Sequence, residues 1–195
     1  MTSDRAERLA DITADAFSDD PFNRWVFGSF DRMKRTFMAE ARTVYLPRGE
    51  TEIIGDAAAM MWLPPGRSKD LPVLSGLAVL GRLFLSGGPK PALRAVQASN
   101  ALSKAFPQDP VAYLFTIAVR PSAQGAGHGG ALMRAFVNHC DALGCAAWLE
   151  SSNPDNRGFY NHYGFGTRDI LTVAPGAPPQ ELMYRPAAPP PTVLS

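Results

Sequence analysis

Cysteine is scarce in this sequence: the 195 residues include only Cys140 and Cys145. Their spacing matches neither the paired cysteines of a zinc site nor a C-x-x-C redox motif. We therefore expect no metal centre, and we interpret both residues as core thiols of a protein in the reducing cytoplasm. The sequence also lacks a Ser-His-Asp order or a distinctively placed cysteine, so nothing in it supports catalysis through a covalent acyl-enzyme.

The sequence also has no large excess of positive or negative charge. The 19 lysines and arginines nearly balance the 18 aspartates and glutamates, for a formal net charge of +1. Because no overall field would attract nucleic acid or an anionic membrane, we expect neither as a partner. The most apolar stretch, residues 71–85, is interrupted by Gly76, Gly81 and Arg82 and is shorter than the roughly 20 residues of a membrane span. Residues 1–8 lack the apolar core of a signal peptide, which again predicts a cytoplasmic protein.

The sequence does contain an ordinary globular balance, with 46% hydrophobic and 19% charged residues. The length suits a single domain, which we place at residues 1–185. Within it we expect N-terminal helices and a hairpin at 1–66, a helical insertion at 67–109 and a C-terminal half at 110–185. Residues 186–195 are rich in proline and should form a flexible tail.

Periodicity predicts the elements of the first half. Apolar residues at spacings of three and four indicate amphipathic helices, the second of them with Asp31 as its N-cap. Gly55 and Asp56 form a tight turn between two strands. The predicted elements are helices at 4–17 and 31–45, strands at 51–54 and 57–63, and two helices within 71–106.

The second half alternates strands and helices around a glycine-rich loop. An apolar stripe that includes Cys140 indicates a helix after this loop, and Gly144 is placed to end it. The predicted elements are strands at 111–119, 145–150, 167–173 and 181–185 and a short helix at 155–163.

The order of strand, glycine-rich loop and helix at residues 113–140 indicates a binding site. A helix N-terminus offers unpaired N–H groups and the positive end of the helix dipole, and glycines let a phosphate approach them closely. Glycines are also common in purely structural turns, so the letters alone leave both interpretations open. A Walker loop is excluded, because Gly130 and Ala131 stand where Lys and Ser or Thr are required. The sequence from Gly125 matches the letters of a dinucleotide-binding G-x-G-x-x-G motif. The strand before it lies in the middle of the chain, however, and the acidic residue expected about 20 residues later is not placed at a strand end.

Two motifs resemble those of the GNAT superfamily of N-acetyltransferases. Residues 120–129 (RPSAQGAGHG) are similar to its acetyl-CoA motif, R/Q-x-x-G-x-G/A after a strand. Residues 149–165 are similar to its second motif, a strand and an Asn-bearing turn followed by Phe-Tyr and Gly-Phe. The segments 149–152 (LESS) and 61–64 (MWLP) resemble the branch that includes puromycin N-acetyltransferase.

This resemblance implies an α/β fold in which a mixed, mostly antiparallel central sheet is flanked by helices. The helical insertion around 71–106 and a minimal or missing first strand would distinguish this chain from the usual family pattern. The sheet should splay between the strands near Val119 and Glu150, with acetyl-CoA bound in the gap by the half at 110–185.

The same resemblance implies a set of acetyl-CoA-binding residues. Backbone groups at the end of the strand would bind the pantetheine arm and thioester, and loop N–H groups would bind the pyrophosphate. His128 would either touch a phosphate or face solvent, and the two asparagines would either bond the pantetheine or cap the next helix. The implied residues are Ile117, Ala118, Val119, Gln124, Gly125, Ala126, Gly127, His128, Gly129, Gly130, Asn153 and Asn156.

Two catalytic residues are implied as well. Tyr160 would donate a proton to the departing CoA thiolate, although its type and position also suit a core aromatic. Glu150 would take the proton of the acceptor amine or hold a cationic substrate, or it is simply a solvated carboxylate at a strand end. Asp19 and Asp20 are weaker candidates for the same role.

The predicted function is direct transfer of an acetyl group from acetyl-CoA to the primary amine of a small molecule. The acceptor should lie beneath the first two helices and beside Trp62, with Phe22 and Trp25 as walls. Residues 71–106 either complete this pocket or provide packing or a homodimer contact. The alternatives are a protein or peptide N-acetyltransferase, a non-catalytic acyl-CoA-binding module and a nucleotide-binding oxidoreductase.

Overall fold

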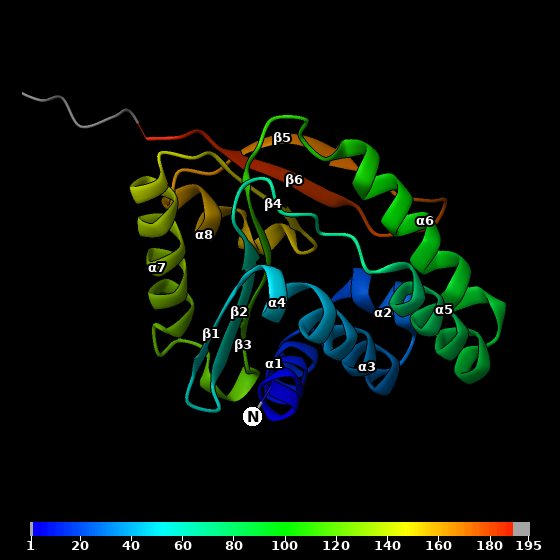
Figure 1. Ribbon diagram of the computed structural model, residues 1–195. Coiled ribbons are helices and arrows are strands. Elements are labelled where there is room, and N and C mark those ends of the chain that lie inside the picture. Colours follow the sequence, from blue (N-terminus) through cyan, green and yellow to red (C-terminus); the bar gives the residue numbers. More distant parts are fainter. Residues whose placement is uncertain (1, 189–195) are drawn as a thin grey trace, which may run out of the picture.

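The computed structural model of this protein describes residues 2–188 (Figure 1). The first element is helix α1 (Thr2–Ala16), in agreement with the helix predicted there and with no strand ahead of it among these residues. Residues 186–188 of the predicted proline-rich tail have no regular structure, and the remainder of the tail lies outside the described residues.

The centre of the fold is a mixed sheet. Within residues 2–188 six strands form it in the order β1-β2-β3-β4-β6-β5, and every neighbouring pair is antiparallel except β3 and β4, which are parallel. This confirms the predicted fold class of a mostly antiparallel sheet flanked by helices. The strands are β1 (Glu50–Ile54), β2 (Ala58–Leu63), β3 (Ala112–Val119), β4 (Ala147–Ser151), β5 (Gly166–Leu171) and β6 (Gln180–Arg185).

Helices cover both faces of the sheet (Figure 1). On one face α1 and the segment after α3 (Phe30–Glu40) bury Met61, Leu63 and Trp148. On the other face α7 (His128–Leu143) and α8 (Arg157–His162) pack over side chains such as Leu114 and Leu149. Strand β2 is buried along its whole length because both of its faces are covered in this way.

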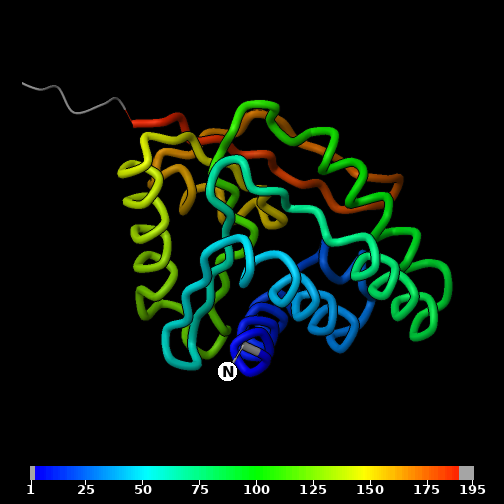
Figure 2. Tube along the Cα trace, viewed as in Figure 1, coloured from blue at the N-terminus to red at the C-terminus, as the bar shows by residue number. Residues whose placement is uncertain are grey.

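Residues 71–106 form the two predicted helices, α5 (Val73–Gly87) and α6 (Pro89–Ala105). Figure 2 shows this pair on the flank of the molecule opposite α7. Both helices pack beside α2 (Pro21–Phe27) and α3, where they close a third apolar core. Several apolar side chains of α5 stay exposed to solvent: Val73, Leu74, Leu77, Phe84 and Leu85.

The structure corrects the sequence analysis at two helix starts. Helix α2 was not predicted, although Asp20 caps its first turn, Pro21 occupies its first position and Gly28 ends it with φ of 67°. The N-cap of α3 is Ser29, which accepts from the N–H of Arg32, rather than Asp31. The chain continues from α3 into a π-helical turn, η1 (Ala41–Tyr45), and α4 (Leu46–Arg48).

The sheet opens between β3 and β4. The two strands pair only from Ala112 to Leu114, opposite 147–149. The register between β2 and β3 then skips Phe115, so β3 contains a β-bulge where its pairing with β4 ends. A bulge bends a strand and interrupts its pairing, which explains why the rest of β3, up to Val119, leaves β4. The predicted gap is therefore present.

None of the helices within residues 2–188 is long and apolar enough to cross a membrane.

Candidate active site

A cleft of about 630 Å³ lies at this gap. Its walls are the end of β3, the glycine-rich loop, the first turn of α7, the turn before α8 and the junction of α1 and α2. The cleft brings together most of the predicted cofactor residues with Tyr160. The predicted residues that line it are Ile117, Val119, Gln124, Gly125, Gly127, His128, Gly129, Gly130, Asn153, Asn156, Tyr160, Asp19 and Asp20.

The N-terminus of α7 forms one end of this cleft. Gly125 and Gly127 both have φ of 81°, a left-handed conformation that glycine adopts without strain, and Gly127 is the N-cap. The N–H of Ala131 donates to the Gly127 carbonyl at 3.0 Å, which is the first hydrogen bond of the helix. The N–H groups of the three residues before Ala131 therefore have no acceptor within the helix. A Cβ on Gly127 would meet open space within 4 Å, which leaves room for a phosphate against the backbone. The residues present thus fit a pyrophosphate group.

The open edge of β3 forms a second wall. The N–H of Arg120 donates to Ala57 on the β2 side, and backbone groups of successive residues alternate in direction. The backbone groups of Val119 and Ile117 therefore point towards the gap, where an extended pantetheine arm could pair with them. Ala118 does not line the cleft, because its side chain is buried against the α1 face and its backbone faces β2.

The two asparagines have different environments. Asn153 caps the short 3-10 turn before α8, since its Oδ1 accepts from the N–H of Asp155 at 3.0 Å. This is the capping alternative, although the residue also lines the cleft. Asn156 lies at the cleft on the same turn and is exposed. Ala126 is exposed and lies outside the lining of the cleft, so its side chain is not part of the site.

Tyr160 presents its ring to the cleft from α8. The residue is 8% exposed and packs edge-on against Phe159 and Phe165. Burial raises the pKa of its hydroxyl well above the usual range, and the negative charge of nearby Asp20 adds to this effect. The hydroxyl is therefore protonated at neutral pH and able to donate. Among the described residues no group of three or more His, Cys, Asp or Glu could hold a metal ion.

Comparison with known proteins agrees with this geometry. The model of the acetyltransferase (GNAT) family matches residues 94–165. An uncharacterized N-acetyltransferase of Schizosaccharomyces pombe is 28% identical over 202 residues, which are 92% of this chain and 78% of the yeast protein. These findings support the GNAT acetyltransferase superfamily, whereas the puromycin N-acetyltransferase branch is not confirmed.

Solved structures show the same architecture. A Corynebacterium glutamicum protein described as histone acetyltransferase HPA2 and related acetyltransferase aligns with a TM-score of 0.72 at 22% identity, over 98% of this chain and 96% of that one. Arylalkylamine N-acetyltransferase 2 of Aedes aegypti aligns with a TM-score of 0.61 at 13% identity, over 95% of each chain. This chain has the GNAT fold.

A second cavity of about 410 Å³ lies on the α1 face of this GNAT fold, beneath the insertion. Helices α2, α3, α5 and α6 line it with mostly apolar side chains, and residues 71–106 therefore form part of its wall. The first turn of α2 separates it from the cleft: Asp20 and Pro21 line the cleft, and Phe22 and Asn23 line the cavity. Strand β3 is also shared, with Phe115 in the cavity and Ile117 in the cleft.

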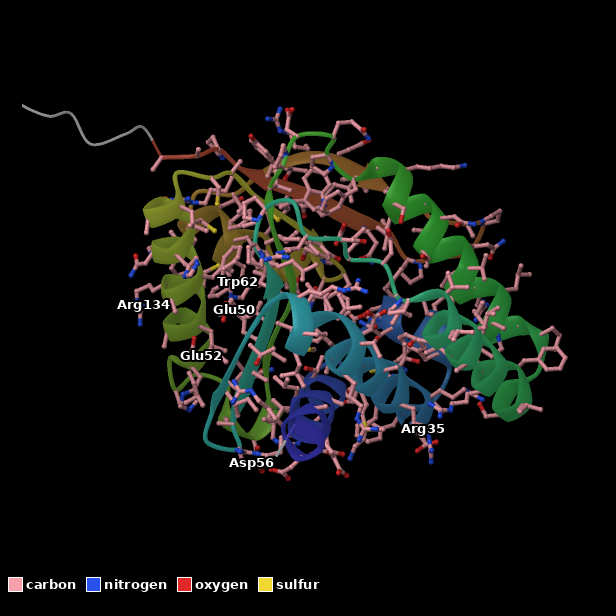
Figure 3. All side chains as sticks on the ribbon, in the orientation of Figure 1. Arg35, Glu50, Glu52, Asp56, Trp62 and Arg134 are labelled. Atoms are coloured by element: carbon pink, nitrogen blue, oxygen red, sulfur yellow. The ribbon has the colours of Figure 1, made fainter. Side chains whose placement is uncertain are left out.

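Of the three predicted wall residues, only Phe22 lines this cavity. Trp25 stacks on Phe22 and lies 4.6 Å below the guanidinium of Arg94, outside the lining. The prediction for Trp62 is corrected, because Trp62 packs against Phe136 and His139 of α7 on the opposite face of the sheet. Figure 3 shows Trp62 on the α7 side.

Glu150 does not line either space. Its side chain is 7% exposed, accepts from Trp148 Nε1 at 2.9 Å and lies 3.8 Å from Lys69 Nζ. The ammonium of Lys69 also rests over the ring of Tyr113. The carboxylate predicted as a base therefore already has partners inside the protein.

The structure adds a residue that the sequence analysis missed. Glu40, at the end of α3, lines the second cavity. Burial raises the pKa of its carboxyl to about 8, partly offset by the positive charge of Lys69. Its place at the end of an amphipathic helix gave no sign of this, since polar helix-end residues are usually solvated.

Proposed function

We propose that this protein is an acetyl-CoA-dependent N-acetyltransferase that moves an acetyl group directly to a primary amine. The observation that carries the proposal is the cleft itself. It combines the free N-terminus of α7, the unpaired edge of β3 and the protonated hydroxyl of Tyr160 in one space. A pyrophosphate, an extended pantetheine and a thiolate leaving group require these three features.

The reaction follows from this arrangement. The lone pair of the amine nitrogen attacks the thioester carbonyl carbon, and N–H groups of Ile117 or Val119 stabilise the resulting oxyanion. The N–C bond forms, the C–S bond breaks, and the sulfur takes the hydroxyl proton of Tyr160. The surplus proton on the nitrogen returns through solvent to Tyr160, which restores the starting state.

The second cavity favours a small-molecule acceptor. Its volume of about 410 Å³ and its mostly apolar lining suit a small ligand. The yeast relative is named as an N-acetyltransferase, which supports nitrogen as the acceptor atom. A cytoplasmic location stays a prediction, as does a homodimer, for which the exposed apolar side chains of α5 offer a surface.

A thiol-release assay tests the proposal. Wild type and Tyr160→Phe are compared with acetyl-CoA and a panel of alkylamines, aminoglycosides, polyamines, amino acids and short peptides. We expect release with at least one small amine and its loss in the variant. Selective turnover of peptides would favour the protein acetyltransferase, and tight CoA binding without any turnover would favour the non-catalytic module.

A further inference from the structure

The cavity beneath the insertion has an uneven chemical character. Most of its lining is apolar, with Phe22, Phe27, Phe37, Val79, Leu102 and Phe115 among the side chains that face it. Glu40 enters this lining from α3, immediately before the π-helical turn η1, and Lys69 and Asp70 line the cavity as well. π-Helical turns occur frequently at functional sites. The carboxylate interacts electrostatically with Lys69 and Asp70, but no hydrogen bond to it is found among the described residues.

When Glu40 is ionised, it and the neighbouring carboxylates outnumber the cations around it. Lys69 and Asp70 face it from the loop before α5, and Glu150 faces Lys69 from β4. The Lys69 ammonium lies 3.8 Å from Glu150, and among the described residues no cation lies within 4 Å of the Glu40 carboxylate, although the charge of Lys69 still acts on it. The nearby hydroxyls of Tyr45 on η1 and Tyr113 on β3 are neutral, because burial raises the pKa of each well above its usual range. Arg48 of α4 is turned to the backbone carbonyls of Ser68 and Asp70.

The cavity extends to the start of the gap between β3 and β4. Tyr113 pairs with Trp148 of β4, and Phe115 is the first residue of β3 beyond this pairing. Both residues line the cavity, and Phe115 stacks on Tyr45 at 4.6 Å. A ligand with its polar end near Glu40 and Tyr113 therefore lies beside the point where the gap between the strands begins.

We propose that Glu40 binds the ammonium group of the acceptor and takes its proton, and that the acceptor is a primary amine on an apolar body. This inference rests on the proposed acetyl transfer for its catalytic part only. The proton moves from the ammonium nitrogen to a carboxylate oxygen of Glu40, and the nitrogen keeps its lone pair for attack on the thioester. After the amide leaves, Glu40 returns the proton to solvent.

Burial favours this proton transfer. A low-dielectric cavity raises the pKa of a carboxyl group and lowers that of an amine. The neutral pair of carboxylic acid and amine is therefore stabilised relative to the ion pair of carboxylate and ammonium. With its pKa at about 8, Glu40 is mostly protonated at pH 7 in the empty cavity and ionised at pH 9. Amine binding should therefore strengthen as the pH rises through 8, until the amine itself loses its proton near pH 10.

Calorimetric titration tests the proposal without requiring turnover. n-Hexylamine, n-hexanol and spermidine are titrated into wild type, Glu40→Gln and Glu52→Gln at pH 8.5 in the presence of CoA. Glu52 is the matched control, because it is exposed on β1 and lies near α7, away from the insertion (Figure 3). We expect n-hexylamine to bind wild type and Glu52→Gln equally, and Glu40→Gln at least 10-fold more weakly. n-Hexanol should bind all three proteins alike, and spermidine should bind weakly because its body is polar.

Equal n-hexylamine affinity in wild type and Glu40→Gln would overturn the inference, and so would absence of n-hexylamine binding to wild type. Glu40→Asp keeps the carboxylate but places it on a shorter side chain. This variant should recover part of the n-hexylamine affinity, which would show that the loss in Glu40→Gln is not a folding defect. Unchanged KM for a turned-over amine in Glu40→Gln would also contradict the inference while leaving acetyl transfer intact. Glu40-dependent binding without turnover would instead contradict only the proposed acetyl transfer.

Discussion

At the scale of single residues, Tyr160 is the side chain on which the chemical step depends. Tyr160→Phe removes the donor hydroxyl but keeps the ring that packs against Phe159 and Phe165. We expect kcat to fall about 100-fold, the lower range for loss of a general acid, because a thiolate is a good leaving group. The KM for acetyl-CoA should change little. Steady-state kinetics measures both, and an unchanged kcat would remove Tyr160 from the mechanism.

The pH profile provides a second check on Tyr160. Because burial raises the pKa of its hydroxyl, the group stays protonated through mildly alkaline pH. Activity should therefore not decline between pH 7 and pH 9 on account of this residue. A loss of kcat in that range that is absent in Tyr160→Phe would show that the hydroxyl ionises there.

Glu40 should make the fold less stable as the pH rises. Its folded-state pKa of about 8 lies above the ordinary value of 4.5, so the folded protein binds the proton more tightly than the unfolded chain. The associated stability is fully present below pH 4.5 and is lost as the pH rises through 8, by on the order of 4 kcal/mol. Glu40→Gln lacks this loss. Urea unfolding at pH 5 and pH 9 measures the free energy of unfolding of both proteins. The stability of Glu40→Gln relative to wild type should be higher at pH 9 than at pH 5, and the same relative stability at both pH values would contradict the assigned pKa.

At the scale of elements, the two ends of α7 carry a testable difference. Gly127 at its N-cap and Gly144 at its C-cap both have positive φ, so alanine at either position costs about 1–2 kcal/mol. Of the two, only Gly127 lines the cleft. We expect Gly127→Ala to raise the KM for acetyl-CoA at least several-fold and Gly144→Ala to leave it unchanged. Similar KM values in the two variants would mean that the loop does not bind the cofactor.

The first turn of α2 should couple both ligand spaces. Asp20 accepts from the N–H and side-chain amide of Asn23 at 2.8 Å and from the hydroxyl of Ser152. Asp20→Ala removes this cap, which costs about 1 kcal/mol, and loosens the wall between cleft and cavity. We expect KM to rise for both acetyl-CoA and the amine. If kinetics shows a change for one substrate only, α2 is not a shared wall.

Element patterns also show what the sequence could predict. The strand, glycine loop and helix around Gly127 were predictable because backbone conformation, helix start and chemistry all depend on the same few residues. Helix α2 was missed because it is only seven residues long and its N-cap, Asp20, comes only three residues after the end of the predicted helix at 4–17. The face of Trp62 could not be predicted, since β2 is buried on both sides and shows no alternation.

At the scale of the whole molecule, the active site depends on elements distant in the sequence. The cavity joins α2 and α3 to the insertion. Arg94 of α6 donates to the carbonyl of Trp25 of α2 at 2.7 Å, although the two residues are 69 positions apart in the sequence. The spacing of residues in the sequence does not indicate such contacts, which explains why Glu40 was not identified as a cavity residue. The roles of Glu40 and of the insertion thus emerge only from the packed structure.

The central claim is direct acetyl transfer from acetyl-CoA to an amine. The most direct measurement follows both products of one reaction, free CoA by thiol titration and N-acetylated amine by mass spectrometry, with n-hexylamine as the first acceptor tested and the wider panel after it. The account predicts equal amounts of the two products with wild type and little of either with Tyr160→Phe. CoA release without an acetylated amine, or tight CoA binding with no product from any acceptor, would contradict it.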